Sequence, residues 1–257
     1  MELLVLKVLV GFIVGILIGM TGVGGGVLLL PVLIFGLKVP ALMAVGSDAL
    51  FNFFTKVPAS LMHLKKETVR RKVVLALAAG SVPGSICGVK VLMLIRHVYG
   101  DGVNHFIKMA VGVLLLIIPL LLLFQHQIEE RVANRPPTMK GFAGMVVIGV
   151  VAGLLVGMTS VGSGSIIMML LLLFYSFPPK VNVGTDIVHA VVLTGVTGLL
   201  HFRLGNVDPT LVLTLLLGSI PGGLIGSHLA TRVPMLWLRR ILCALLLITG
   251  ARMLWPV

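Results

Sequence analysis

The chain has 257 residues, of which 58% are hydrophobic and 11% are charged, and its mean hydropathy is +1.16. A soluble globular domain carries roughly 25% charged residues, so this composition excludes one and predicts an integral membrane protein. The net charge of +12 does not indicate a nucleic-acid partner, because lysine and arginine gather in the predicted loops, as the positive-inside rule describes.

Eight apolar segments follow one another along the chain, each with about the 20 residues that a helix needs to cross a bilayer. The runs are continuously apolar, which favours helices over the alternating strands of a membrane barrel. The sequence therefore predicts an all-α polytopic membrane protein. The first and fifth segments are too long for one straight crossing. The predicted segments are 3–37, 41–62, 73–95, 106–124, 141–175, 181–202, 209–230 and 237–255.

An internal duplication relates the two halves of the chain. A shift of 138 residues places Gly11–Gly88 on Gly149–Gly226 with 25 identities in 78 positions and no gap. The matches include "GMTGVGGG" with "GMTSVGSG", "VGSD" with "VGTD", and "GSVPG" with "GSIPG". We interpret the chain as two pseudo-symmetric four-segment repeats, 1–124 and 141–257, joined by a polar linker at 125–140.

The relative orientation of the repeats depends on whether residues 3–37 cross once as a broken helix or turn back as a re-entrant hairpin. A hairpin leaves three full crossings in each half and so inverts the second repeat. With hairpins, 12 of the lysines and arginines outside the membrane lie on one side and 6 on the other. With a single crossing, the numbers are 11 and 7. The positive-inside rule thus favours inverted repeats and leaves parallel repeats open.

Each over-long segment contains a break rich in glycine and hydroxyl residues, at 21–26 and at 159–164. Unpaired backbone groups are tolerated in a membrane only where protein, water or a ligand satisfies them. A half-helix that starts near Val27 or near Ser165 would offer free N–H groups and a positive dipole end to an anion. Isolated glycines such as Gly11, Gly15 and Gly19 are better explained by close helix packing. The predicted substrate-binding residues at the breaks are Thr21, Gly24, Gly25, Gly26, Thr159, Gly162, Ser163, Gly164 and Ser165.

Polar residues also occur on the helices that follow the breaks. Asp48 and Asp186 lie inside apolar segments, where a carboxyl group is costly. Each is either a proton-coupling group or a structural acceptor for backbone exposed at a break, and both interpretations stay open. Asn52 and Lys56 follow Asp48 at steps of four and share its helix face. We include them in the substrate site together with His189, although Lys56 could instead extend its ammonium group to the membrane surface.

Enzyme chemistry has little support in the sequence. No Ser-His-Asp order, HExxH motif or cluster of metal ligands surrounds His63, His189 or His201. Cys87 and Cys243 lack metal-binding spacing and are predicted to be small core residues. We therefore expect no enzymatic activity, no cofactor and no metal site.

The duplication, the two "GxxxGMT" openings, the "VGSD"/"VGTD" pair and the "GSVPG"/"GSIPG" pair together resemble the TauE/SafE family of sulfite exporter-like permeases, over Gly11 to Leu254. The resemblance implies a multi-pass carrier in the cell inner membrane, with relatives linked to sulfur-containing anions. It also implies that 21–26 and 159–164 line the transport path.

The function expected from these observations is a secondary transporter, most simply an exporter, of small sulfur-containing oxyanions such as sulfite or organosulfonates. It would work by alternating access, with coupling to protons as an option. The alternatives are a cation transporter that uses Asp48 and Asp186, and a membrane scaffold without transport activity. The expected partners are the anion and the lipid bilayer, and a homodimer is left open.

Overall fold

The computed structural model describes the whole chain except residues 1, 22–24, 134–140, 176, 230–234 and 256–257. Every regular element in the described part is a helix. In chain order the elements are α1 (Glu2–Thr21), α2 (Gly25–Pro31), the π-helical turn η1 (Val32–Gly36), α3 (Ala41–Lys65), α4 (Arg71–Tyr99), α5 (Gly102–Ala133), α6 (Phe142–Thr159), α7 (Ser165–Tyr175), α8 (Pro179–Arg203), α9 (Pro209–Leu229) and α10 (Met235–Leu254).

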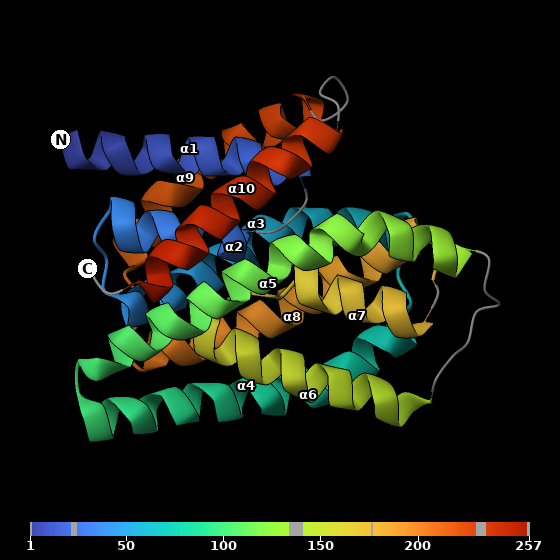
Figure 1. The fold of residues 1–257 in the computed structure, drawn as a ribbon, viewed down its shortest axis with the longest axis horizontal. Helices are drawn as coiled ribbons and strands as arrows, with labels where there is room; N and C mark the ends of the chain where they lie inside the picture. Colours follow the sequence, from blue (N-terminus) through green and yellow to red (C-terminus); the bar gives the residue numbers. More distant parts are fainter. Residues whose placement is uncertain (1, 22–24, 134–140, 176, 230–234, 256–257) are drawn as a thin grey trace.

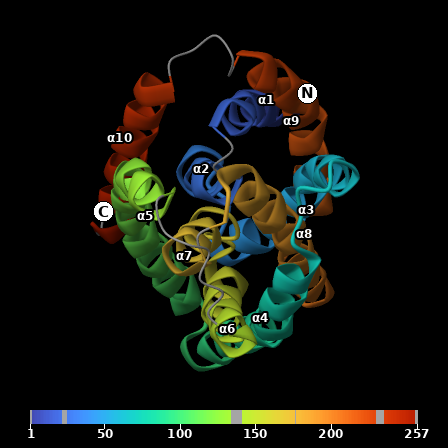
Figure 2. The ribbon, with the colours of Figure 1, turned by 90° about the vertical axis from the view of Figure 1, so that its right-hand side faces the viewer.

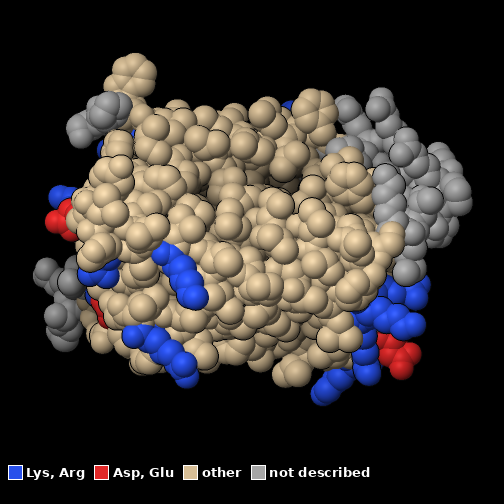
Figure 3. Space-filling model, turned by 90° about the horizontal axis from the view of Figure 1, so that it is seen from below, with Lys and Arg blue, Asp and Glu red and all other residues tan. Residues whose placement is uncertain are grey.

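The surface of the bundle suits a lipid bilayer. In the described part, five helices are long and apolar enough to cross a membrane, and they lie within α4, α5, α6, α8 and α9. Figure 3 shows lysine and arginine mainly towards the two ends of one face, with uncharged side chains between them. The exposed residues of these helices include many large apolar side chains, such as Leu75, Leu213 and Leu217. The chain is therefore a multi-pass α-helical membrane protein.

Both of the over-long segments are interrupted. Helix α1 ends at Thr21 and α2 begins at Gly25, two residues before the predicted start at Val27. Helix α6 ends at Thr159 and α7 begins at Ser165, as predicted. In Figure 1, α1 runs from the N-terminus towards the right and α2 returns towards the left, while α6 runs leftwards and α7 returns to the right. The two segments are hairpins, and they enter the bundle from opposite ends.

Glycines bring two pairs of helices into backbone contact. Gly11, Gly15 and Gly19 of α1 meet Leu215, Ser219 and Gly223 of α9 in the same order, so the two helices run parallel. Gly149 and Gly153 of α6 meet Leu77 and Ser81 of α4 in the same way. The packing role predicted for Gly11, Gly15 and Gly19 is confirmed. Figure 2 shows these pairs on opposite sides of the bundle, with α2 and α7 inside it.

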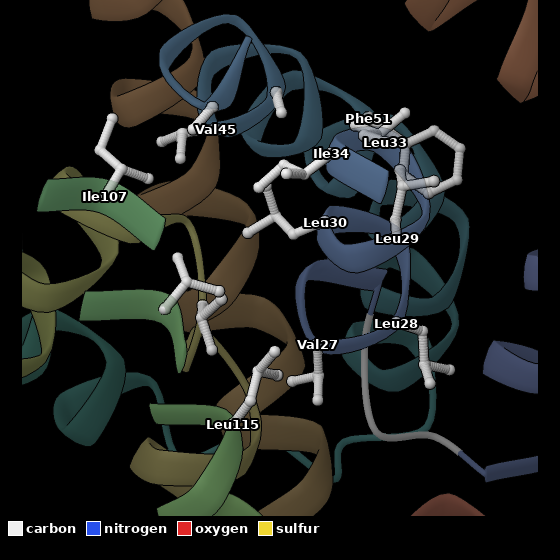
Figure 4. Packing of buried hydrophobic residues seen from close by; sticks show 14 of the residues in the cluster. Val27, Leu28, Leu29, Leu30, Leu33, Ile34, Val45, Phe51, Ile107 and Leu115 are labelled. Carbon is white, nitrogen blue, oxygen red and sulfur yellow. The ribbon is translucent and has the colours of Figure 1, made fainter. Parts of the chain in front are cut away.

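The core is centred on the short helix α2. All seven of its residues are buried, and Leu29, Leu30 and Leu33 of α2 and η1 are completely inaccessible. Figure 4 shows side chains from α2 between Phe51 of α3 and Leu115 of α5. An all-round apolar helix of this kind is expected in the centre of a bundle, where it has no polar face to present. The packing holds the glycine end of α2 in a defined place.

Two details differ from the sequence interpretation. Helix α5 continues to Ala133, into the stretch predicted as linker, since no proline occurs before Pro136 to end it. Cys243 is buried as predicted, but Cys87 is exposed, so the prediction of a core position for Cys87 was wrong. The reason is that Cys87 lies on α4 next to Gly88, and only the glycine face of α4 packs against α6.

We predict that Gly15→Ala destabilises the fold by about 1–3 kcal/mol, the usual cost of overpacking a filled interface. A Cβ atom at Gly15 would lie 2.5 Å from the Ser219 carbonyl oxygen, and backbone cannot move aside as a side chain can. Gly223→Ala is the matched control in the same helix pair, because its nearest contact would be at 3.8 Å. Thermal unfolding of the purified proteins in detergent measures the difference, and equal midpoints for the two variants would contradict the prediction.

Candidate functional site

A chain of buried hydrogen bonds connects the two helix breaks through α3. The backbone N–H of Gly25, at the start of α2, donates to Oδ1 of Asn52 at 2.9 Å. The amide nitrogen of Asn52 donates to Oδ2 of Asp48, also at 2.9 Å. The hydroxyl of Ser160, at the end of α6, donates to the same carboxylate oxygen at 2.7 Å. Asp48, Asn52 and Ser160 are all completely buried, so this connection is shielded from water.

Gly26 allows the two breaks to approach each other closely. A Cβ atom at this position would lie 2.7 Å from the backbone oxygen of Ser160 and 3.0 Å from Oδ2 of Asp48. The first of these distances is shorter than a real Cβ contact, and the atom concerned belongs to backbone. Only glycine fits here without displacing the second break.

The second break is held by its own polar groups. Ser160 ends α6 in the left-handed conformation, with φ of +57°, and its N–H donates to the carbonyl of Val156. A serine in this conformation is uncommon, and here its hydroxyl bond to Asp48 compensates part of the strain. Thr159 donates its hydroxyl to the carbonyl of Leu155 and accepts from the N–H of Val161. Gly162 has φ of +98°, a conformation that favours glycine.

A lysine from the first half reaches the second break. The ammonium group of Lys56, on α3, donates to the hydroxyl of Ser163 at 3.1 Å and to its carbonyl at 3.3 Å. Lys56 is half-buried and Ser163 is buried. The ammonium group is therefore directed into the bundle and towards the break in this structure, and not towards a membrane surface.

The second aspartate has different neighbours. Asp186 and His189 lie one turn apart on α8 and are buried, with exposed fractions of 5% and 0%. Nε2 of His189 lies 2.8 Å from the hydroxyl of Ser81 on α4. Oδ1 of Asp186 and Nδ1 of His189 are buried atoms without a hydrogen-bond partner among the described residues.

The remaining predicted residues lie at the edges of this region. Gly164 and Ser165 are partly exposed at the start of α7, and Oγ of Ser165 has no hydrogen-bond partner in the part of the chain that the structure describes. Thr21 is the last residue of α1. Gly24 and the side chain of Thr21 lie outside the described residues.

The sequence reasoning did not include two hydrogen-bonding partners of the predicted site residues, Ser160 and Ser81. Ser160 was noticed only as one more hydroxyl at the break, yet it binds Asp48. Ser81, in the repeated "GSVPG" motif, was considered as a possible cavity hydroxyl but was not included in the site, and its hydroxyl lies 2.8 Å from Nε2 of His189. One signal for Ser160 exists in the sequence, because the halves differ there: Gly22 and Asn52 of the first half correspond to Ser160 and Ala190 of the second.

The fold and this polar centre define a multi-pass α-helical membrane protein with paired interruptions inside the bundle. Comparison with known families then places it: residues 7–253 match the family described as "Sulfite exporter TauE/SafE", and the chain belongs to this family. Proteins of this family are membrane transporters, so the chain is a membrane transporter and not an enzyme.

Several curated proteins are similar along nearly their full length. The probable membrane transporter protein YjnA of Bacillus subtilis (strain 168) is 36% identical over 251 residues, which cover 96% of this chain and 98% of the relative. Probable membrane transporter protein YunE of the same organism is 27% identical, with 98% and 97% covered. Probable membrane transporter protein YdhB, also from that organism, is 24% identical, with 89% and 91% covered. No solved structure is significantly similar to the chain.

We predict that Ser160→Ala lowers the free energy of unfolding by about 1–3 kcal/mol, because it removes a donor from the buried carboxylate of Asp48. Ser227→Ala is the control, since the hydroxyl of Ser227 is exposed and bonds only to a carbonyl of its own helix. Thermal unfolding in detergent compares the two. A Ser160→Ala protein as stable as the control would show that the connection between the breaks contributes little.

Proposed function

We propose that the protein is a secondary transporter that exports a small sulfur-containing oxyanion, such as sulfite or an organosulfonate, across the cell inner membrane. The substrate binds near the second break, between Lys56 and the hydroxyl residues Ser163 and Ser165. Gly25, Asn52 and Asp48 shape the other side of this site through the hydrogen bonds between the breaks.

The contact between Lys56 and Ser163 carries this proposal. A lysine inside a membrane bundle is costly and is kept where its charge has a use. An oxyanion that replaced the hydrogen bond to the Ser163 carbonyl would receive the ammonium group together with the hydroxyl of Ser163. Ser165 offers a second hydroxyl, whose oxygen has no other partner in the described structure. Preorganised donors of this kind favour an anion over a cation.

The choice of sulfur oxyanions rests on the family, whose description names a sulfite exporter. Sulfite and sulfonates present three oxygens around sulfur, which several converging donors can bind at once. The direction of transport rests on the same description.

We propose further that the halves are inverted repeats which alternate access by rocking. Equivalent contacts at the two ends of the bundle support this. The N–H of Asp208 donates to the hydroxyl of Ser47. Under the 138-residue shift Arg70 corresponds to Asp208 and Thr185 to Ser47, and the N–H of Arg70 donates to the hydroxyl of Thr185 in the same way. One bond joins the first half of α3, which carries Asp48, to the loop after α8. The other joins the first half of α8, which carries Asp186, to the loop after α3. Opening one of them while the other stays closed would expose the centre to one side of the membrane.

Lys56→Met is expected to reduce anion exchange at least tenfold, because it removes the charge that faces the second break. The measurement is counterflow in proteoliposomes with labelled sulfite, methanesulfonate, sulfate and a divalent cation as separate probes. Lys56→Arg should keep part of the activity. Lys90→Met is the matched control, since Lys90 is an exposed lysine on the long helix α4.

The same assay separates the alternatives. Exchange of sulfite or methanesulfonate supports the proposal, and exchange of the cation alone would replace it by cation transport. No exchange of any probe, or equal activity of Lys56→Met and wild type, would contradict the proposed site.

The hairpin topology predicts that residue 2 and residue 38 face the same side of the membrane, with residue 67 on the opposite side. In a protein with Cys87 and Cys243 replaced, single cysteines at Glu2, Lys38 and Glu67 are labelled from outside with a membrane-impermeant thiol reagent. Glu2 and Lys38 should give the same result and Glu67 the opposite one. Labelling of Glu2 and Glu67 from the same side would indicate a single crossing.

A further inference from the structure

The two repeated aspartates occupy equivalent positions but have unequal partners. Oδ2 of Asp48 accepts hydrogen bonds from Ser160 and Asn52. The residues that correspond to these donors in the other half are Gly22 and Ala190, and neither type carries a side-chain donor. Accordingly, no described residue donates a hydrogen bond to the carboxyl group of Asp186. Oδ1 of each aspartate is a buried atom without a partner among the described residues, so the two differ in the donors at Oδ2 of Asp48.

Lys56 also has no equivalent lysine in the second half. Lys56 corresponds to Thr194 in the second half, and the hydroxyl of Thr194 donates to the carbonyl of Ala190 in its own helix. The second half therefore has no ammonium group at this position, and Lys56 of the first half reaches the second break, where it contacts Ser163. Because Asp48 already has two donors and Asp186 has none among the described residues, Asp186 is the carboxyl group that we pair with Lys56.

Besides Lys56, helix α3 brings His63 towards α8, where it lies against Gly184, two residues before Asp186. Helix α8 also packs against α4, α6 and α7. Helices α6 and α7 contain no charged residue, and Tyr175 of α7 lies against Gly144 of α6. On α4, Ser81 faces His189, whereas the titratable residues Arg71, Lys72, Lys90, Arg96 and His97 are exposed. His189, with one unpartnered ring nitrogen, is the titratable neighbour on α8 itself.

We infer that the two aspartates have separate tasks: Asp48 holds the breaks together, and Asp186 binds the proton that accompanies a monovalent oxyanion through the membrane, with Lys56 as the shared counter-ion. This inference rests on the proposed function and names the charge class of its substrate. His189 and Ser81, one turn along α8, form the polar contact through which a proton could reach Asp186.

Charge balance explains why the proton and the anion travel together. Without substrate, ionised Asp186 and Lys56 neutralise each other in a medium where net charge is costly. When a proton forms an O–H bond with Asp186, the charge of Lys56 is released and an anion of charge −1 restores neutrality. Asp48 keeps its hydrogen bonds throughout and stays protonated, so it contributes no charge to this balance. Such a carrier exports the anion whenever the internal excess of anion outweighs the pH gradient.

The test compares Asp186→Asn and Asp48→Asn in proteoliposomes that contain a pH-sensitive dye. The probe is labelled methanesulfonate, which is a monoanion at every pH used, or labelled sulfite if wild type exchanges only sulfite. Wild type should acidify the lumen during net uptake of the anion, and this uptake should rise as the pH falls. Asp186→Asn mimics the protonated acid, so it should still exchange external for internal anion, while its net uptake neither acidifies the lumen nor depends on pH in this way. Asp48→Asn should unfold at a lower temperature, and whatever anion uptake its folded fraction retains should still acidify the lumen in proportion to that uptake.

The outcomes separate this inference from the proposed function. If wild type exchanges no anion, the proposed function fails first. If wild type exchanges the anion and Asp186→Asn still moves protons with it, the inference fails and the function stands. Asp186→Ser gives a second, smaller replacement in case Asp186→Asn does not fold. A folded Asp186 variant that neither exchanges the anion nor moves protons would assign Asp186 to anion binding and would also overturn the inference.

Discussion

The structure depends on satisfying polar groups where two helices are broken inside an apolar bundle. Lipid offers no hydrogen bonds, so the groups left free at Gly25 and Ser160 need partners from the protein. Asp48 and Asn52 provide them by bonding the start of α2 and the end of α6 at once. The same requirement accounts for Gly26, which lets the two breaks approach, and for the fully buried α2, whose packing against α3 and α5 holds its first turn in place.

Duplication and later divergence explain the unequal centre. Both halves carry a glycine-rich break and an aspartate one helix later, but the partners of the aspartates differ. Ser160 and Asn52 hold Asp48, whereas the corresponding residues of the other half, Gly22 and Ala190, are types without a side-chain donor. The polar centre is therefore asymmetric, with Lys56 directed from one half into the break of the other.

The helices around this centre pack as pairs that combine the two halves. Glycines bring α1 onto α9 and α6 onto α4 at backbone contact, and Ser47 and Thr185 anchor the aspartate helices to opposite loops. The contacts at the two ends use equivalent residues and the same bond, a backbone N–H donating to a hydroxyl. These equivalent contacts are the basis on which alternating access is proposed for this protein.

The sequence alone determined the helical membrane class, the duplication, both breaks and the family, because apolar length, glycine clusters and a gapless repeat are local features of the chain. It also selected Asp48, Asn52, Lys56 and Ser163 as polar residues in apolar surroundings. It left open which groups Asp48 and Lys56 contact, and it did not pair Ser160 with Asp48 or Ser81 with His189. Those answers depend on contacts between residues more than 100 positions apart, such as Asp48 with Ser160 and Ser81 with His189. Helical periodicity places a residue on a face of its own helix, whereas tertiary packing decides which other helix that face meets.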